Sequence, residues 1–365
     1  MKEARAFEGD AGARGRSLSN DICTVDQGLK KWLEICEKEG KDGGDPVTKG
    51  TVQNYEYRAG IIRSYNWTKP LHELKPPDIV EFRSWLLLNY SRSVAHKALT
   101  SLHSMARELV IRGMLSQNFV AGITIQSNSR YDQPVTIPTE ADVRALLSAA
   151  DDLANSKNET IKNAWVRYRP MLYLAADSGM RPQEYIVVAK SNLKDKGVQV
   201  ERALERLGEI SVTKTPAGRR FIDLSPHTLD LVKHYADHHA VDNKYDLVFP
   251  AQTGKWLSHK NWLRRGFYVA CFKANLVEEV EEEGEIVTRP KFRPYDLRHF
   301  YASMLIDQNV NLKRVQYLMG HENIETTLNV YAHLIERADA KTQARTGLLS
   351  SMQTPSCGKS VAADT

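Results

Sequence analysis

The feature that most restricts how this chain can fold is a succession of helical patterns over residues 25–122. In each pattern the apolar residues recur at intervals of three and four, so they gather on one face of a helix. The first two patterns include Leu29 and Tyr55, the third opens at Pro77, and the fourth runs from about Val94 to Arg112. This succession predicts an all-helical domain over residues 21–125.

A break in the periodicity separates this domain from the rest of the chain. Residues 127–138, SNSRYDQPVTIP, are rich in Pro, Asn and Ser, which is typical of an exposed connection. We therefore place a linker at residues 126–138 and a second domain at residues 139–350. Thr139 with Asp142 three residues later forms a capping-box signal for the helix that opens this domain. Residues 1–20 and 351–365 have no periodic apolar positions and are predicted to be disordered tails.

The second domain is mostly helical, but the region between Leu193 and Leu224 differs. It contains the short β-type runs GVQVE, EISVTK and RRFIDL, and the turn sequence TPAG at residues 215–218 separates the last two. The predicted fold class is therefore mainly α, with a small antiparallel β-sheet in the C-terminal domain.

Composition limits the possible partners and compartment. A net charge of +5 and a pI of about 8.8 permit a nucleic-acid partner without demonstrating one. The chain has neither an apolar run that could span a bilayer nor a signal-peptide pattern, so we expect a cytoplasmic, DNA-associated protein and no membrane partner. Its four cysteines are scattered and predict neither disulfides nor a zinc site, and no carboxylate cluster has metal-ligand spacing.

Two charged segments stand out in the second domain. An acidic run over residues 278–285 is predicted to be a solvated loop or hairpin tip. A basic helix is predicted from about Ser258, with Trp262, Phe267 and Phe272 available for its buried face. Its basic face either contacts DNA or is only solvated.

A tyrosine near the C-terminus has two interpretations. Tyr331 shares a helical face with Ile324, Leu328 and Leu334, which is the pattern of a core tyrosine. It also follows an arginine and a Gly-His step on segments that read as helices, and a tyrosine in such company can attack phosphorus and break a DNA strand.

Several residues upstream of Tyr331 also have two interpretations. Gly179 suits the left-handed end of one helix and Pro182 the first turn of the next, which puts Arg181 at a helix N-terminus that can hold a phosphate. The alternative is a surface pair between Arg181 and Glu184. Lys214, before the TPAG turn, either reaches a DNA groove or is simply solvated.

The last candidates lie between Pro294 and His321. A helix is predicted to start at Pro294 and Asp296, with Arg298 in its first turn, where a cation is disfavoured unless an anion is nearby. The helix containing Val315 is predicted to end at Gly320, so that His321 lies at a helix-to-helix corner.

The motifs SGMRPQE, VTKT, PYDLRH and MGHENIETTLNVYAHL, in this order and at these separations, resemble the catalytic domain of the tyrosine recombinases, or phage-integrase-type site-specific recombinases. The N-terminal helical pattern resembles their core-binding domain, and the resemblance covers about residues 21–340. The resemblance implies that Tyr331 is the nucleophile and that Arg181 and Arg298 clamp the non-bridging oxygens of the scissile phosphate. It also implies that Lys214 protonates the departing 5′ oxygen and that His321 hydrogen-bonds the phosphate. Glu184 is expected to help hold the site together.

One position departs from the family pattern. The family commonly has histidine two residues before the Leu-Arg step, where this chain has Tyr295. A phenol is a poorer acid-base group than imidazole at neutral pH, but it can donate a hydrogen bond. Tyr295 is therefore expected to contact the phosphate without exchanging protons.

The resemblance implies a metal-independent strand transferase without a cofactor, which forms a 3′-phosphotyrosine and integrates or excises a mobile element. Its implied partners are double-stranded DNA recombination sites, three further copies of the chain in a tetramer on DNA, and an accessory DNA-bending or directionality factor. Two alternatives stay open: a type IB topoisomerase that relaxes supercoils, and a catalytically weak DNA-binding relative.

Overall fold

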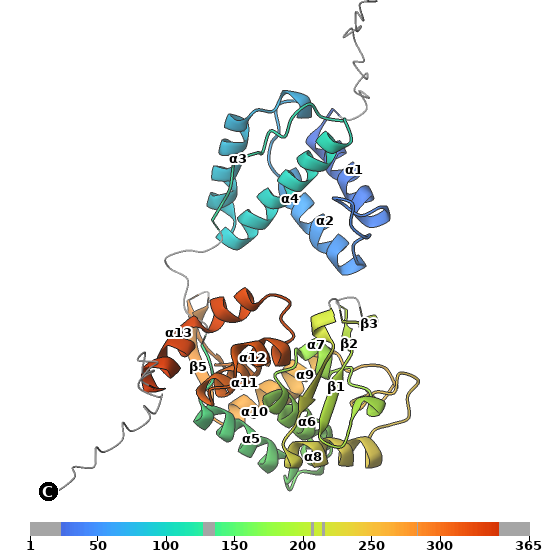
Figure 1. Cartoon of the computed structure of the whole chain (residues 1–365), viewed down its shortest axis with the longest axis vertical. Helices are drawn as coiled ribbons and strands as arrows, with labels where there is room; N and C mark the ends of the chain where they lie inside the picture. Colours follow the sequence, from blue (N-terminus) through green and yellow to red (C-terminus); the bar gives the residue numbers. More distant parts are fainter. Residues whose placement is uncertain (1–22, 127–135, 206–207, 214–215, 283, 343–365) are drawn as a thin grey trace, which may run out of the picture. The chain divides into compact units, whose positions relative to one another are not determined.

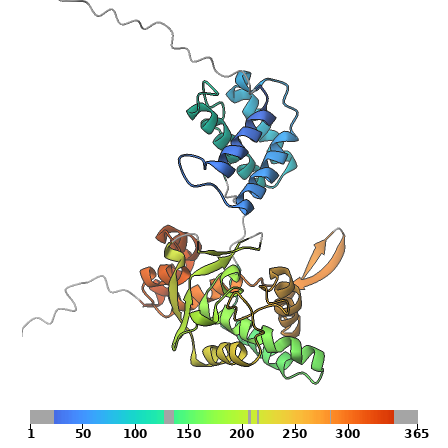
Figure 2. The ribbon, with the colours of Figure 1, turned by 90° about the vertical axis from the view of Figure 1, so that its right-hand side faces the viewer.

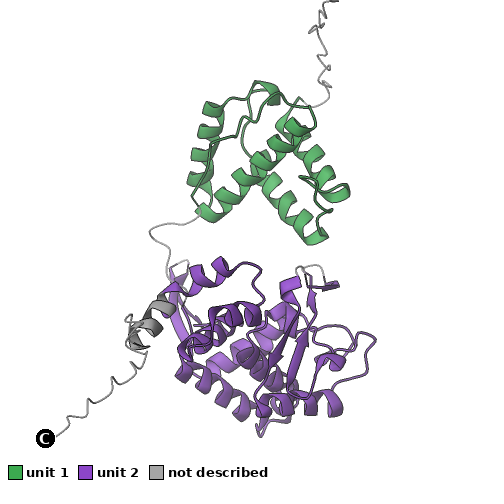
Figure 3. Ribbon diagram, viewed as in Figure 1, with its two compact units in different colours: residues 1–134 green, residues 135–365 purple. Residues whose placement is uncertain are grey.

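The computed structural model describes residues 23–126, 136–205, 208–213, 216–282 and 284–342. The chain divides into two compact units, Met1–Pro134 and Val135–Thr365 (Figure 3). Both predicted tails, residues 127–135 of the predicted linker, and Lys214 lie outside the described residues.

Unit 1 is helical (Figure 1). Its elements are α1 (Val25–Lys38), α2 (Lys49–Arg63), the short 3-10 helix η1 (Leu71–Glu73), α3 (Pro76–Asn89) and α4 (Arg92–Ile111). Thr24 caps α1 in a capping box with Gln27. As expected for the fourth helical pattern, the apolar residues of α4 gather on one buried face, which consists of Leu99, Leu102, Met105, Ala106 and Leu109.

Unit 2 is built around α6 (Glu159–Ser178), which packs against α5 (Glu140–Ala154), α8 (Pro226–His238) and α11 (Asp296–Asp307). The predicted Thr139 capping box opens α5, with Asp142 as its partner. The short helix α7 (Pro182–Tyr185) follows α6, and the turns η2 (Lys190–Asn192) and η3 (Pro216–Gly218) flank the strands. The C-terminal helices are α12 (Leu312–Met319) and α13 (Ile324–Thr342), and a separate apolar cluster joins them to α11.

The predicted antiparallel strands are present, but the two strands on either side of the predicted turn do not pair with each other. Strand β1 (Gly197–Val200) pairs with β4 (Arg220–Asp223), and β2 (Arg202–Leu204) pairs with β3 (Ile210–Val212). Together they make one long hairpin that closes where Glu205 and Glu209 hydrogen-bond, at 2.7 Å. The described part of the TPAG segment, Pro216–Gly218, forms the 3-10 helix η3, and β3 and β4 on either side of it do not pair with each other. Gly218 is packed against Thr213, so η3 forms a compact kink between β3 and β4.

The acidic run is part of a second hairpin, formed by β5 (Val277–Glu282) and β6 (Glu285–Pro290). Figure 2 shows this hairpin standing away from the helices of unit 2. The described glutamates of the run are exposed, as predicted.

Two predicted apolar faces were partly wrong. The basic helix consists of α9 (His259–Trp262), a π-helical turn at Leu263–Phe267 (η4) and α10 (Tyr268–Lys273). Trp262 and Phe267, at the two ends of the π turn, are buried. Phe272 is 50% exposed, because five residues of α-helix place it about 140° around the axis from Phe267. On α13, Ile324 and Leu328 are exposed, because Thr327 and Tyr331 are the residues that turn into the protein.

No described helix is long and apolar enough to cross a membrane.

Candidate functional site

Arg181 is held where two helices meet. Gly179 ends α6 with a left-handed φ of 59°, and a side chain there would collide with the Tyr301 ring at 2.3 Å. Arg181 is the N-cap of α7 and Pro182 its first residue, as the sequence predicted. The Arg181 side chain is about one-third exposed, with a relative accessibility of 32%. This guanidinium is thus fixed at a helix N-terminus while part of it remains open to solvent.

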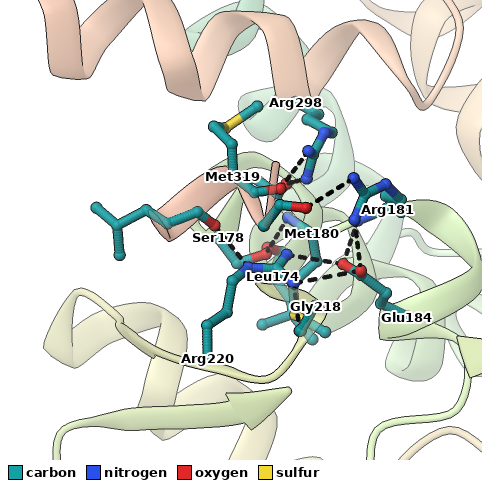
Figure 4. A network of polar contacts seen from close by, with 12 residues as sticks. Leu174, Ser178, Met180, Arg181, Glu184, Gly218, Arg220, Arg298 and Met319 are labelled. Atoms are coloured by element: carbon teal, nitrogen blue, oxygen red, sulfur yellow. Dashed lines mark hydrogen bonds and ion pairs between the residues drawn. The ribbon is translucent and has the colours of Figure 1, made fainter. Parts of the chain in front are cut away.

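Glu184 anchors Arg181 from within the same turn (Figure 4). Its Oε2 accepts the Arg181 backbone N–H at 2.8 Å, and its Oε1 accepts Arg181 Nη1 at 3.0 Å. The predicted Arg181–Glu184 pair therefore exists, but Glu184 is buried and does not form a surface pair. Burial by itself raises the pKa of Glu184, whereas Arg220 and Arg181 together bring it below its ordinary value. The carboxylate stays ionised.

The second partner of Glu184 is Arg220, a residue to which the sequence analysis gave no role. Its side chain is fully buried, and its Nη2 donates to Glu184 Oε2 at 2.8 Å. The same guanidinium donates to the backbone carbonyls of Gly218 at 2.9 Å and Leu318 at 2.6 Å. Arg220 therefore joins α7, the η3 kink and the end of α12 (Figure 4). Strand alternation offered a signal, since Arg220 shares a face of β4 with the buried Ile222.

Both predicted arginines, Arg181 and Arg298, donate hydrogen bonds to backbone carbonyls at the C-terminal end of α12. The helix ends at Gly320, whose φ is 60° and where an added Cβ would lie 2.9 Å from Arg220 Nη1. Arg181 Nη2 donates to the Gly320 carbonyl at 3.1 Å. Arg298, in the first turn of α11 as predicted, donates to the carbonyls of Met319 and, at 2.6 Å, Gly179. The ends of α6 and α12 are thus joined through Arg298 (Figure 4).

Arg298 is almost completely buried, with 1% of its surface exposed. Burial, followed by the positive charge of Arg181, lowers the pKa of Arg298 to about 10. It is still cationic at neutral pH. Two positive charges are therefore placed close together, and no carboxylate among the described residues forms an ion pair with Arg298, so an anion would stabilise this arrangement.

His321 lies at the corner after α12, as predicted. Its Nδ1 lies 2.9 Å from the Oγ1 of Thr327, a fully buried residue of α13. Burial and the positive charge of Arg298 lower the pKa of His321 to about 4, so its ring is neutral at physiological pH. A neutral imidazole beside two guanidinium groups can hydrogen-bond an anion without adding charge.

Tyr331 projects from α13 into the cluster that joins α11 to α13, and only 1% of it is exposed. Its Oη lies 2.9 Å from Nδ1 of His299 on α11. Burial raises the pKa of Tyr331 above its ordinary value. His299, which the sequence analysis gave no role, is therefore the nearest described acid-base partner of this phenol. Its signals were its position next to Arg298 and one helical turn after Tyr295.

Tyr295 is the N-cap of α11 and is 41% exposed. Its ring packs edge-on against His299, with the ring centroids 5.3 Å apart. It has no described hydrogen bond to Tyr331.

A cavity of about 660 Å³ opens beside Arg181. Its lining includes Glu184, Thr213, His259 and Gly320. The structure thus brings Arg181, Glu184, Arg298 and His321 together around the end of α12 and connects Tyr331 to α11. In the described part of unit 2, no group of three or more His, Cys, Asp or Glu side chains could hold a metal ion.

Comparison with known proteins identifies relatives of this arrangement. Residues 138–337 match the phage integrase family. The tyrosine recombinase XerC of Proteus mirabilis is 27% identical over 317 residues, which cover 85% of this chain and 90% of the relative. The XerC protein of Vibrio atlanticus is 29% identical over 244 residues, covering 65% of this chain and 66% of that protein.

Solved structures show the same fold. The integrase of the transposon Tn1549, determined in complex with a circular intermediate DNA, superposes with a TM-score of 0.66 at 19% identity, covering 88% of this chain and 100% of that chain. A lambda integrase tetramer bound to a Holliday junction superposes with a TM-score of 0.59 at 17% identity, covering 87% of this chain and 83% of that one.

Proposed function

Because the chain belongs to the phage integrase family of tyrosine recombinases, we propose that it cleaves and rejoins DNA at specific sites through a 3′-phosphotyrosine on Tyr331. The observation that carries this proposal is the convergence of Arg181 and Arg298 on the end of α12, one corner away from the helix that holds Tyr331. A core tyrosine alone would need no pair of guanidinium groups beside it.

The proposed chemistry needs charge stabilisation and positioning. Tyr331 Oη attacks phosphorus, the bond from phosphorus to the 5′ oxygen breaks, and Lys214 donates the proton that this oxygen takes up. Arg181 and Arg298 neutralise the non-bridging oxygens, which is the role that metal ions have in many other phosphoryl-transfer enzymes. His321 hydrogen-bonds the phosphate and Tyr295 contacts it from the start of α11. We therefore propose a reaction that requires neither metal nor cofactor.

Glu184 supports the reaction indirectly. Its two oxygens hold Arg181 and Arg220 in fixed orientations, so the donors of Arg181 need little reorganisation when a phosphate arrives. The energy of the broken phosphodiester is kept in the phosphotyrosine, so a new 5′ hydroxyl can reseal the strand without ATP.

We propose double-stranded DNA recombination sites as the substrate and a tetramer of this chain on two such sites as the active assembly. The solved structures of the Tn1549 integrase on a circular intermediate DNA and of a lambda integrase tetramer on a Holliday junction support this choice. The proposed biological reaction is integration or excision of a mobile element. Basic residues spread through unit 1 supply phosphate contacts, and affinity should then fall steeply with salt.

The test begins by selecting duplexes that the full chain binds from a random-sequence pool. A selected duplex that is nicked near the cleavage point traps the covalent intermediate, because the short strand carrying the 5′ hydroxyl diffuses away. Wild type should form a covalent adduct and Tyr331→Phe should form none. An adduct with Tyr331→Phe contradicts the nucleophile assignment, and absence of an adduct with wild type favours a DNA-binding relative. Repeated relaxation of plasmids that lack the selected site favours a topoisomerase.

A further inference from the structure

The nucleophile assigned to Tyr331 requires a group that removes its proton, because a buried phenol with a raised pKa is almost entirely protonated at neutral pH. Tyr295 occupies the position where an imidazole would be expected, and its phenol is a poor proton acceptor. An imidazole does contact the proposed nucleophile in the described structure, but it belongs to His299, one helical turn after Tyr295 on α11. His299 Nδ1 and Tyr331 Oη are 2.9 Å apart.

We propose that His299 is the general base that accepts the phenolic proton of Tyr331 during DNA cleavage. This inference rests on the proposed function. It makes His299 a catalytic residue, and it gives Tyr295, besides its proposed phosphate contact, the role of packing against the His299 ring and positioning it.

The proton balance is complete with residues of this chain. The Tyr331 O–H donates to the lone pair of His299 Nδ1, the other ring nitrogen carrying the hydrogen of the neutral ring. As the proton moves to Nδ1, an oxygen electron pair forms the new bond to phosphorus. The bond to the 5′ oxygen breaks, its electron pair stays on that oxygen, and Lys214 protonates it. On rejoining, the 5′ hydroxyl attacks phosphorus and gives its proton back to neutral Lys214, the bond from phosphorus to Tyr331 Oη breaks, and the His299 imidazolium returns its proton to Tyr331.

The surroundings keep His299 in the state that a base needs. Burial and the neighbouring Arg298 lower the pKa of His299, whereas Asp296 opposes them. From α13 it faces Tyr331, and on its own helix it contacts the Tyr295 ring. The lowered pKa of His299 favours the neutral imidazole at physiological pH. Asp296, three residues earlier on α11, is available to stabilise the imidazolium once it forms.

His321 is the other imidazole of the site, and its geometry suits a different role. Its Nδ1 lies at hydrogen-bond distance from Thr327. Arg298, Arg181 and Arg220 all lower the pKa of His321, in addition to the effect of burial. His321 is thus suited to contact the phosphate, whereas His299 is the imidazole at hydrogen-bond distance from Tyr331.

The test measures single-turnover adduct formation on the nicked, selected duplex between pH 5 and 9, with wild type, His299→Ala and His299→Gln. We expect both variants to react about 10²- to 10⁴-fold more slowly at pH 7, the range for loss of a general base. The variant rates should then rise about tenfold per pH unit toward the phenol pKa, whereas the wild-type rate should level off near neutrality. His238→Ala, an exposed histidine of α8, is the matched control and should react like wild type.

A modified duplex separates base from acid. With sulfur in place of the bridging 5′ oxygen, the leaving group needs no proton, so Lys214→Ala should regain activity and the His299 variants should stay slow. Gel-shift affinity for the unmodified duplex should be unchanged in the His299 variants, which shows that they fold and bind.

Three outcomes overturn the inference: His299 variants with the wild-type pH profile, variants as fast as wild type, or variants restored by the sulfur substrate. Each of these leaves the proposed function intact as long as wild type forms the adduct and Tyr331→Phe does not. If wild type forms no adduct, the proposed function itself fails.

Discussion

The two units bury charge in very different ways. In unit 1 the buried acid Glu108 pairs with Arg112, whose side chain is 29% exposed, so water still reaches one partner. In unit 2 the buried acid Glu184 pairs with Arg220, whose side chain is 0% exposed, and Arg298 lies buried nearby. Buried charge is costly to desolvate and is retained only when other groups compensate for it. Unit 1 is thus a largely apolar scaffold whose described buried acid keeps a partner in contact with water, whereas the centre of unit 2 gives up some stability to hold cations in fixed positions.

The largest expected effect comes from removing the fully buried cation. Arg220→Met leaves Glu184 without its main partner and the carbonyls of Gly218 and Leu318 without donors. We expect unit 2 to lose about 3–5 kcal/mol in unfolding free energy, as when one member of a buried ion pair is removed. Hydrogen exchange read by mass spectrometry in increasing denaturant reports this loss separately for peptides of each unit.

Arg220→Lys is the matched variant, since it keeps the charge but not the forked donor set. Arg220→Lys should recover part of the unfolding free energy that Arg220→Met loses. Its rate of adduct formation should still be lower than that of wild type, because Glu184 then orients Arg181 less firmly. Equal stability of Arg220→Met and wild type would show that the polar centre is not held by this residue.

A cavity in unit 1 should have a comparable effect on stability but none on chemistry. Leu102 is fully buried on α4, and Leu102→Ala should cost about 2–5 kcal/mol in the exchange of unit 1 peptides. Below the temperature at which unit 1 melts, the rate constant for adduct formation at saturating protein should match wild type. A lower rate constant under these conditions would contradict the division between scaffold and reaction centre.

How much of this division is predictable from sequence depends on the range of the contacts involved. The α4 core, the capping boxes and the left-handed ends at Gly179 and Gly320 follow from residues within a few positions of one another. The Glu184–Arg220 pair spans 36 residues and the His299–Tyr331 pair spans 32, so no local pattern reports them. Arg220 and His299, which had no predicted role, each contact a residue that had one, Glu184 and Tyr331 respectively.

The wrong prediction for α13 has the same origin. The predicted face of α13 included Ile324 and Leu328 because they are apolar, but the packing of α11 and α12 selects Thr327 and Tyr331. Strand alternation and helical spacing predict which residues can share a face. They do not predict which face a neighbouring helix will cover.

A third, smaller effect is expected from acid. The pKa of His321 falls from its ordinary value of 6.5 to about 4 in the folded protein. A group with a lowered folded pKa contributes stability that is complete above its unfolded pKa and is lost as pH falls toward the folded value. The stability of unit 2 should therefore decline between pH 6.5 and 4, by at most about 1.4 kcal/mol per pH unit.

His321→Gln removes this titrating ring and should make the decline in unit 2 peptides less steep, while His299, whose pKa is also lowered, still contributes to it. The decline should persist in wild type at high salt, because burial is its largest cause and is not screened. If the stability of unit 2 falls as steeply with pH in His321→Gln as in wild type, other groups titrate in this range. Protonation of His321 is then not what limits stability in acid.

The smallest effect is expected from the exposed partner in unit 1. Arg112 contacts Glu108 at 2.9 Å and Glu39 at 2.8 Å, and solvent screens both interactions. Arg112→Gln keeps a hydrogen-bond donor near Glu108, so unit 1 should lose about 1 kcal/mol or less in the hydrogen-exchange measurement. Substitution of the equivalent partner in unit 2, Arg220→Gln, should cost several times more, since water cannot replace the lost charge. Similar losses for these two variants would remove the distinction between the units, because burial of the cation would then have no effect on the strength of its pairing.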